Sequence, residues 1–266
     1  MTSPDPPQLR ALAERVARSA GGLLRDGLGR ARSEVGTKTT GTDMVTEMDR
    51  ASEVLIEAEL LEARPDDGIL GEEGANRSGT SGVRWVVDPL DGTTNYLYGF
   101  PGFNVAIAAE IDGATVAGAV YDVVRDELFS AHRGGGATRD GAAITPSSTT
   151  DLALALVGTG FSYDPARRRR QAEALVDVLP KVRDIRRQGA AALDLCSVAC
   201  GRLDAYYERG LAPWDLAAGG LVAAEAGAIL TDLAGAAARP DSVLAAAPGV
   251  AAAVLGVLTA AGAGSD

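Results

Sequence analysis

Strand-like and helix-like segments alternate in both halves of the chain, and this alternation is the strongest constraint on its fold. Apolar residues at three- and four-residue spacing predict helices at 9–24, 46–61, 165–179, 190–200 and 214–226. Short apolar runs between turn residues predict strands at 83–87, 103–111, 115–121, 127–131, 153–158, 182–185 and 204–208, before a last strand and helix. The pattern predicts a layered α/β fold.

The length of 266 residues is enough for one large domain with an extensive core. No repeat of fixed period and no linker-like segment separates the two halves. We therefore expect a single domain over 1–266, with approximate subdomains 1–150 and 151–266.

The formal net charge of −11 and the sequence pI of about 4.7 limit the partners of the chain. Such a field repels nucleic acid, anionic membranes and phosphorylated metabolites, so an anionic substrate would need bound cations. The first residues lack the basic flank and apolar run of a signal peptide, and no apolar stretch is long enough to span a bilayer. We expect a cytoplasmic protein that binds neither membrane nor nucleic acid.

Two carboxylates meet at one tight corner of the sequence. The apolar strand that ends at Asp88 leads directly into Pro89, Leu90, Asp91 and Gly92. Neighbouring carboxylates repel each other unless a cation lies between them, and hard oxygen ligands suit Mg²⁺. An Asx-type turn that needs no metal explains the same residues, so both interpretations stay open at this point.

Further carboxylates lie at the ends of predicted elements, beside glycine or proline: Asp49, Glu72, Glu73, Glu208 and Asp215. Each has an ordinary explanation as a solvated turn, a strand end or a charge in the first turn of a helix. Their shared position at element ends, rather than on helix faces, weakens those explanations taken together.

Other chemistries find less support in the sequence. The single histidine, His132, has no Gly-x-Ser-x-Gly segment to accompany it, and Cys196 and Cys200 are spaced for core packing. The glycines at 134–136 predict a turn rather than a phosphate loop. The arginines at 167–170 predict a solvated helix face, with a patch for a polyanion as the alternative.

Several segments together resemble the inositol monophosphatase family of magnesium-dependent, lithium-sensitive phosphatases. The resemblance rests on Lys38 with 43–49, on 71–73, on 85–95, and on Glu208 with 214–219, in an order that spans most of the chain. It implies an α-β-α-β-α sandwich and a homodimer. It also implies that the first subdomain carries the metals and the second the substrate side.

The resemblance implies two to three Mg²⁺ ions and a role for each matched residue. One ion is held by Glu72, Asp88 and the carbonyl of Leu90, a second by Asp88, Asp91 and Asp215, and a weaker third lies by Glu72. Asp49 and Thr93, with Glu72, act on the attacking water. The amides of Gly92 and Thr93 face the phosphate, and Lys38 lies on a polar loop over 35–43, with Glu73 behind the ligands.

The same resemblance places the organic part of the substrate against Asp91, Gly189, Ala191, Glu208 and Asp215. The chain departs from the family pattern at one position on this side. The family usually has Ser or Thr after the glycine that corresponds to Gly189, whereas this chain has Ala190. The missing hydroxyl puts substrate identity in doubt more than catalysis.

The sequence thus predicts hydrolysis of an inositol monophosphate or a similar polyol phosphate. Histidinol phosphate, fructose 1,6-bisphosphate and 3′-phosphoadenosine phosphate stay open as alternatives, because the loops that choose among them carry no readable code. A regulatory binding protein on the same fold is the alternative from another class.

Overall fold

The computed structural model of the chain describes residues 5–28, 35–37 and 44–264. Two residues of the segments that carry the family resemblance, Lys38 and Asp43, lie outside the described residues. The predicted polar loop over 35–43 is partly wrong. The short strands β1 (Val35–Thr37) and β2 (Met44–Thr46) pair with each other in antiparallel fashion.

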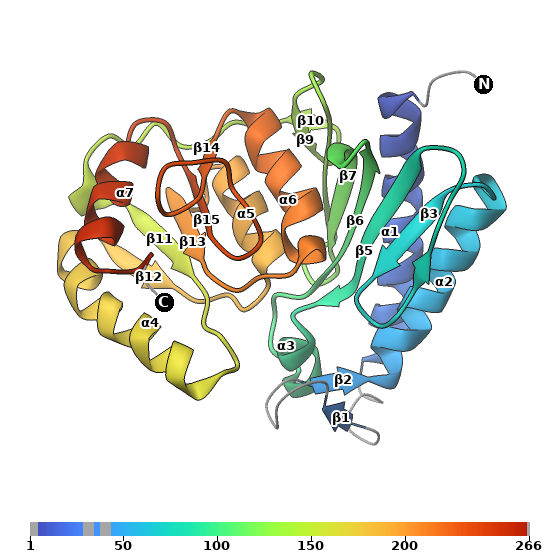
Figure 1. Cartoon of the computed structure of the whole chain (residues 1–266), viewed down its shortest axis with the longest axis horizontal. Coiled ribbons are helices and arrows are strands. Elements are labelled where there is room, and N and C mark those ends of the chain that lie inside the picture. Colours follow the sequence, from blue (N-terminus) through green and yellow to red (C-terminus); the bar gives the residue numbers. More distant parts are fainter. Residues whose placement is uncertain (1–4, 29–34, 38–43, 265–266) are drawn as a thin grey trace.

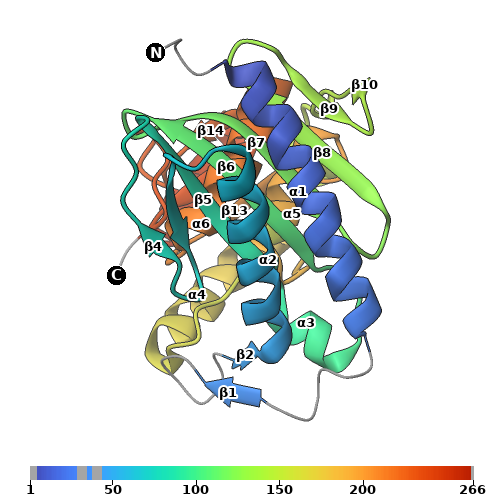
Figure 2. The ribbon, with the colours of Figure 1, turned by 90° about the vertical axis from the view of Figure 1, so that its right-hand side faces the viewer.

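Two sheets and three layers of helices form a five-layer α-β-α-β-α sandwich, which confirms the predicted fold (Figure 1). Helices α1 (Pro6–Gly27) and α2 (Glu47–Ala63) cover the outer face of the first sheet (Figure 2). Helices α5 (Ala191–Ala199) and α6 (Pro213–Ala226) lie between the two sheets, while α4 (Pro165–Val178) and α7 (Ala251–Ala260) cover the second sheet from outside.

The first sheet has eight strands in the order β10-β9-β8-β7-β6-β5-β3-β4. Their bounds are β3 Gly68–Gly71, β4 Asn76–Arg77, β5 Val83–Asp91, β6 Asn104–Ile111, β7 Ala114–Asp122, β8 Glu127–His132, β9 Ala137–Arg139 and β10 Ala142–Ala143. All neighbours pair in antiparallel fashion except β3 and β5, which are parallel.

Successive side chains of β5 point to opposite faces of this sheet, and helices cover both faces. Trp85 and Val87 pack toward α1 and α2, whereas Val86 packs toward α5 and α6. A strand buried on both faces reads as a continuous apolar run, so the following carboxylate, Asp88, is carried into the interior between the layers.

The second sheet has five strands in the order β12-β11-β13-β15-β14. Their bounds are β11 Leu156–Thr159, β12 Asp184–Arg186, β13 Ala205–Glu208, β14 Ile229–Thr231 and β15 Val243–Ala246. Strand β11 is parallel to both of its neighbours, β12 and β13. The end of β13 and the loops beside it line the same cavity as the end of β5 in the first sheet. Figure 1 shows the two sheets with α5 and α6 between them.

Two predicted strand boundaries are wrong for identifiable reasons. Residues Leu152–Leu154 form a 3-10 turn instead of a strand, because the Asp151 carboxylate accepts the N–H of Ala153 at 3.0 Å. Strand β5 does not end at 87 but continues to Asp91, and its register with β6 shifts between Asp88 and Asp91. The shift accommodates Pro89, which has no N–H to give to the ladder.

A glycine-rich turn and an arginine-rich helix have the structural roles expected of them. The N–H groups of Gly134 and Gly136 donate to the two oxygens of Glu225 on α6, at 2.9 and 3.0 Å, so this turn binds a carboxylate of the chain itself. Helix α4 buries Ala174 and Val178 and leaves the arginines at 168–170 exposed.

The remaining sequence expectations concern single residues and membrane segments. Cys196 is fully buried in α5, as expected of a packing residue, and Cys200 follows one turn later. His132 ends β8 on a half-buried turn. Within residues 5–28, 35–37 and 44–264, none of the helices combines the length and the hydrophobicity that a bilayer crossing requires.

Candidate metal and phosphate site

A cavity of about 760 Å³ opens where β5 ends against the loops of the second sheet. It is lined by nearly all of the residues singled out in the sequence: Glu72, Glu73, Asp88, Leu90, Asp91, Gly92, Thr93, Gly189, Ala191, Glu208 and Asp215. Asp49 does not line the cavity but lies directly behind Thr93. We call this space the acidic cavity.

The end of β5 is shaped by short-range hydrogen bonds. The N–H of Leu90 donates to Oδ1 of Asp88 at 3.1 Å, and the hydroxyl of Ser52 on α2 donates to the carbonyl of Pro89 at 2.9 Å. Gly92 then adopts φ +91°, and a side chain there would meet the carbonyl of Gly102 at 2.7 Å. The sharp turn leads into the short helix α3 (Thr93–Tyr98), which sequence analysis did not separate from the loop.

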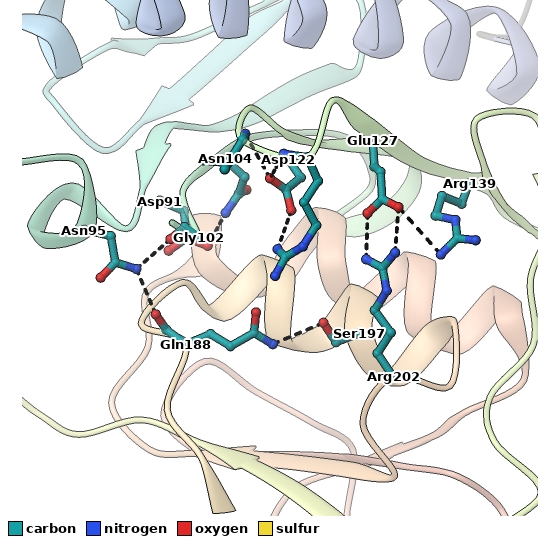
Figure 3. A network of polar contacts seen from close by, with 12 residues as sticks. Asp91, Asn95, Gly102, Asn104, Asp122, Glu127, Arg139, Gln188, Ser197 and Arg202 are labelled. Atoms are coloured by element: carbon teal, nitrogen blue, oxygen red, sulfur yellow. Dashed lines mark hydrogen bonds and ion pairs between the residues drawn. The ribbon is translucent and has the colours of Figure 1, made fainter. Parts of the chain in front are cut away.

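Asp91 joins the first sheet to α5. Its Oδ2 accepts the side-chain amide of Asn104 at 2.8 Å (Figure 3). The same oxygen accepts the backbone N–H of Ala192, in the first turn of α5, at 2.9 Å. A carboxylate at the start of a helix satisfies N–H groups that have no partner within the helix. The orientation of Asp91 is therefore fixed from two layers at once.

Asp88, Asp91 and Asp215 each present an oxygen within 4.8 Å of the other two. Asp215 reaches this place from the first turn of α6, where it also accepts the N–H of Ala212 at 2.6 Å. The sequence-based explanation of Asp215 as a helix-start residue is thus correct, and the residue contributes to the cluster as well.

Electrostatics within this cluster disfavour three free carboxylates. Burial, followed by the charges of Glu72, Asp91 and Asp215, raises the pKa of Asp88 well above its usual range. Burial and then Asp91 do the same to the pKa of Asp215. Burial also raises the pKa of Asp91, although the donors from Asn104 and α5 oppose it. Because carboxylate oxygens at this spacing are the donors that Mg²⁺ prefers, a bound divalent cation fits the residues present.

Glu72 and Glu73 follow β3, which lies beside β5. The N–H of Glu72 donates to the carbonyl of Val87 at 3.2 Å, which holds the residue at the edge of the cluster. The buried carboxylate of Glu53 on α2 accepts the N–H groups of Glu73 and Ala75, both at 2.9 Å. Glu53 thereby fixes the turn that presents Glu72.

Thr93 and Asp49 form a hydrogen-bonded pair at the wall of the cavity. The Thr93 hydroxyl lies 3.1 Å from Oδ1 of Asp49 and 3.1 Å from the carbonyl of Leu90. A hydroxyl has one proton and can accept two further hydrogen bonds, so it can hold a water molecule while it donates to Asp49. Asp49 is fully buried in the first turn of α2.

The opposite wall carries Glu208 at the end of β13. The Tyr206 hydroxyl donates to its Oε2 at 2.6 Å, and burial raises the pKa of Glu208 to about 7. Asn95 connects this wall to the first sheet, because its amide donates to the carbonyls of Gln188 at 2.8 Å and Gly102 at 2.6 Å (Figure 3). The segment that contains Gly189 and Ala191 is held at the cavity by this contact.

Sequence analysis missed the residues that support the site: Ser52, Glu53, Asn104, Arg187 and Asp194. Asn104 would have been the easiest of them to predict, since it lies at the end of a predicted strand and pairs in register with Asp91. Ser52 and Glu53 lie one turn after Asp49 on α2, and Arg187 and Asp194 flank Gly189 and Ala191, but the sequence alone does not show what these side chains contact.

Comparison with known proteins agrees with this geometry. The sequence profile of the inositol monophosphatase family matches residues 5–263. The inositol-1-monophosphatase SuhB of Mycobacterium tuberculosis is 45% identical over 279 residues, covering 97% of this chain and 96% of the relative. The protein named Nus factor SuhB of Vibrio cholerae is 42% identical over 229 residues, covering 84% and 85% of the two chains. The crystal structure of the extragenic suppressor protein suhB from Bartonella henselae superposes with a TM-score of 0.90 at 37% identity, covering 94% and 98%.

The five-layer fold and the acidic cavity define a phosphatase of the class that hydrolyses phosphoric monoesters. Within that class, the chain belongs to the inositol monophosphatase family.

Proposed function

We propose that this enzyme hydrolyses inositol monophosphate or a similar small polyol phosphate, and that Mg²⁺ is its cofactor. The observation that carries the proposal is the cluster of Asp88, Asp91 and Asp215, with oxygens within 4.8 Å of one another, in a cavity that Glu208 also lines. The cluster suits cations that attract a phosphate, and the Glu208 carboxylate suits hydroxyl groups.

Five residues would hold the two to three ions: Glu72, Asp88, Asp91, Asp215 and the carbonyl of Leu90. When the single Thr93 proton is donated to Asp49, both lone pairs of the Leu90 carbonyl oxygen are available, so this oxygen can bind a metal. When bound, Mg²⁺ would act as a Lewis acid that activates water and balances the charge on the leaving oxygen.

The chain's own groups would position the water and the phosphate. Thr93 would hold the attacking water while Asp49 takes up a proton through the Thr93 hydroxyl, with Glu72 on the other side of the water. The amides of Gly92 and Thr93 line the cavity and would donate to phosphate oxygens. Rigid placement of these groups by α2, β5 and the turn at Gly92 limits the reorganisation needed during reaction.

The organic part of the substrate would lie between Asp91, Asp215 and Glu208. Carboxylates accept hydrogen bonds from hydroxyl groups, and backbone at Gly189 and Ala191 completes this side. Ala190 offers no hydroxyl here, so histidinol phosphate, fructose 1,6-bisphosphate and 3′-phosphoadenosine phosphate stay alternative substrates.

Release of inorganic phosphate from a panel of these esters, with Mg²⁺ and with EDTA, tests the proposal. We expect the fastest release from the inositol ester, dependence on Mg²⁺, inhibition by millimolar lithium, and loss of activity in an Asp88→Asn variant. An Asp184→Asn variant is the matched control, because Asp184 is exposed and pairs with Arg186 outside the cavity. Absence of release from every ester, or equal rates in Asp88→Asn and wild type, would refute it.

A second candidate role is binding of a regulatory partner, since the Vibrio cholerae relative is named a Nus factor. The exposed arginines at 168–170 on α4 form a local positive surface on a chain of net charge −11. Retardation of a single-stranded RNA in a gel would test it: retardation that vanishes when Arg168, Arg169 and Arg170 are replaced by alanine supports the role. Unretarded RNA at low salt, where such contacts are strongest, contradicts it.

The homodimer and the cytoplasmic location expected from the sequence stay predictions. Light scattering of the purified chain would measure the first, with twice the mass of 27.1 kDa as the expected result.

A further inference from the structure

One arginine that lines the acidic cavity donates no hydrogen bond to the described residues. Arg187 follows strand β12 and lines the cavity together with Gly189 and Glu208. Among the described residues, its guanidinium makes no hydrogen bond and no ion pair. The preceding residue, Arg186, pairs with Asp184 at 2.6 Å and lies outside the cavity.

The exposed side chain of Arg187 lies against the backbone of Gly189. Gly189 adopts φ +86°, and a side chain at this position would overlap the Arg187 guanidinium. The guanidinium therefore lies across the Gly189 backbone rather than extending away from the protein. The amide of Asn95 lies on the same side of Gly189 and fixes the carbonyl of Gln188, which keeps this segment in place.

Three carboxyl groups near the cavity experience the charge of Arg187, and two of them, Asp91 and Glu208, line it. It lowers the pKa of Asp91, Asp194 and Glu208 against the larger effect of burial in each case. Asp194 is fully buried on α5, and its Oδ1 has no hydrogen-bond partner among the described residues.

An arginine held this way can receive an anion. Its guanidinium presents five N–H donors in a planar fork that matches the oxygens of a phosphate. The acidic cavity offers about 760 Å³, which is near the upper end of the range for small-molecule sites. The side of the cavity where the family's hydroxyl is replaced by Ala190 is the side that carries Arg187.

We propose that Arg187 is a specificity-determining residue that binds a second phosphate on the substrate, so that the enzyme favours bisphosphorylated sugars or polyols over the corresponding monophosphates. The inference rests on the proposed phosphatase function and adds the substrate class. The scissile phosphate lies at the carboxylate cluster, and the second phosphate lies against the guanidinium.

Kinetics with two esters of one sugar test the assignment. We would measure kcat/KM for fructose 1,6-bisphosphate and fructose 1-phosphate with wild type, Arg187→Ala, Arg187→Lys and, as matched control, Arg186→Ala. We expect wild type to favour the bisphosphate, and Arg187→Ala to lower kcat/KM for it by about 10- to 100-fold more than for the monophosphate, as for a lost charged hydrogen bond. Lysine should restore part of the preference, because it keeps the charge without the fork. Arg186→Ala should match wild type.

Equal losses on both esters in Arg187→Ala, or a wild type that favours the monophosphate, would overturn the assignment. Release from inositol monophosphate but from neither fructose ester would overturn it as well and leave the proposed function standing. Release from no ester at all would refute both. Urea unfolding midpoints equal to that of wild type would show that the variants are folded.

Discussion

Two groups of carboxylates lie in or close behind the acidic cavity, and their charged neighbours differ. On the proposed metal side, after burial, the charges of Glu72, Asp91 and Asp215 raise the pKa of Asp88, and those of Asp91, Glu72 and Glu208 raise the pKa of Asp215. On the substrate side, Asp194 and Glu208 share the nearby cation Arg187, which lowers their pKa. The second group thus has an arginine of the chain nearby, whereas the charges that act most strongly on the first group are those of other carboxylates.

This difference follows from how each group is built. The metal side comes from the end of β5, with contributions from the turn after β3 and from the first turn of α6. The substrate side comes from β13, α5 and the loop before α5, all in the second half of the chain. Asp91 belongs to both, since it lies in the metal cluster and also accepts the N–H of Ala192 on α5. Three changes test how far the two sides are separable.

The largest expected effect is on activity, in an Asp91→Asn variant. Asparagine can still accept from Asn104 and Ala192, so the fold should remain, but one negative ligand is lost. We expect kcat to fall about a thousandfold, because the contribution of metal-ion stabilisation is several kcal/mol and each 1.36 kcal/mol is tenfold in rate. Phosphate release and far-ultraviolet circular dichroism would measure both points. A folded variant within tenfold of wild type would show that Asp91 is not a ligand.

The next effect concerns stability against pH, in Glu208→Gln. Glu208 has an ordinary pKa of 4.5 and a folded-state pKa of about 7, so the folded protein binds more protons than the unfolded chain between these values. Stability from this residue is therefore present below pH 4.5 and is lost as pH rises to about 7, by about 3 kcal/mol at 1.36 kcal/mol per pKa unit.

Urea unfolding in EDTA at pH 5 and pH 8 would measure this loss. We expect wild type to lose about 3 kcal/mol more than Glu208→Gln over that range. The hydrogen bond from Tyr206 can also be made to glutamine, so the comparison isolates the charge. Identical pH dependence of the two proteins would mean that Arg187 already keeps Glu208 ionised near its ordinary pKa.

The smallest expected effect is at a carboxylate that belongs to neither group. Glu225 is satisfied by the N–H groups of Gly134 and Gly136, so it needs neither metal nor arginine. In Glu225→Ala we expect about 1–2 kcal/mol of lost stability from two partly exposed charged hydrogen bonds, with kcat unchanged. Thermal unfolding and phosphate release would separate these outcomes. A loss of activity here would show that the site depends on this turn as well.

Much of the metal side was predictable because its residues are close in sequence. An apolar strand that ends in Asp88-Pro-Leu-Asp91 places two carboxylates at one corner by local geometry alone. The layered fold could also be predicted, because the periodicity of apolar residues distinguishes strands from helices and is clear in long elements such as β6 and α1.

The supporting contacts could not be predicted in the same way. Glu53 looks like any acid on a charged helix, and only tertiary folding brings it to the N–H groups of Glu73 and Ala75. Arg187 looks like one of several arginines, and its place in the cavity depends on the left-handed backbone of Gly189. Glu53 is 20 and 22 residues away from the two groups it contacts, whereas Arg187 is close to Gly189 but depends on a backbone conformation that the sequence does not specify.

Metal binding tests the central claim most directly, namely that the carboxylates of Asp88, Asp91 and Asp215 are completed by divalent cations. Isothermal titration of the EDTA-treated protein with Mg²⁺ should show two to three ions per chain, with tighter binding at pH 8 than at pH 6 because the raised pKa values make protons compete with the metal. Asp88→Asn should lose at least one ion. Wild-type protein that binds no Mg²⁺ at either pH, or an Asp88→Asn variant with unchanged stoichiometry and affinity, would contradict the account.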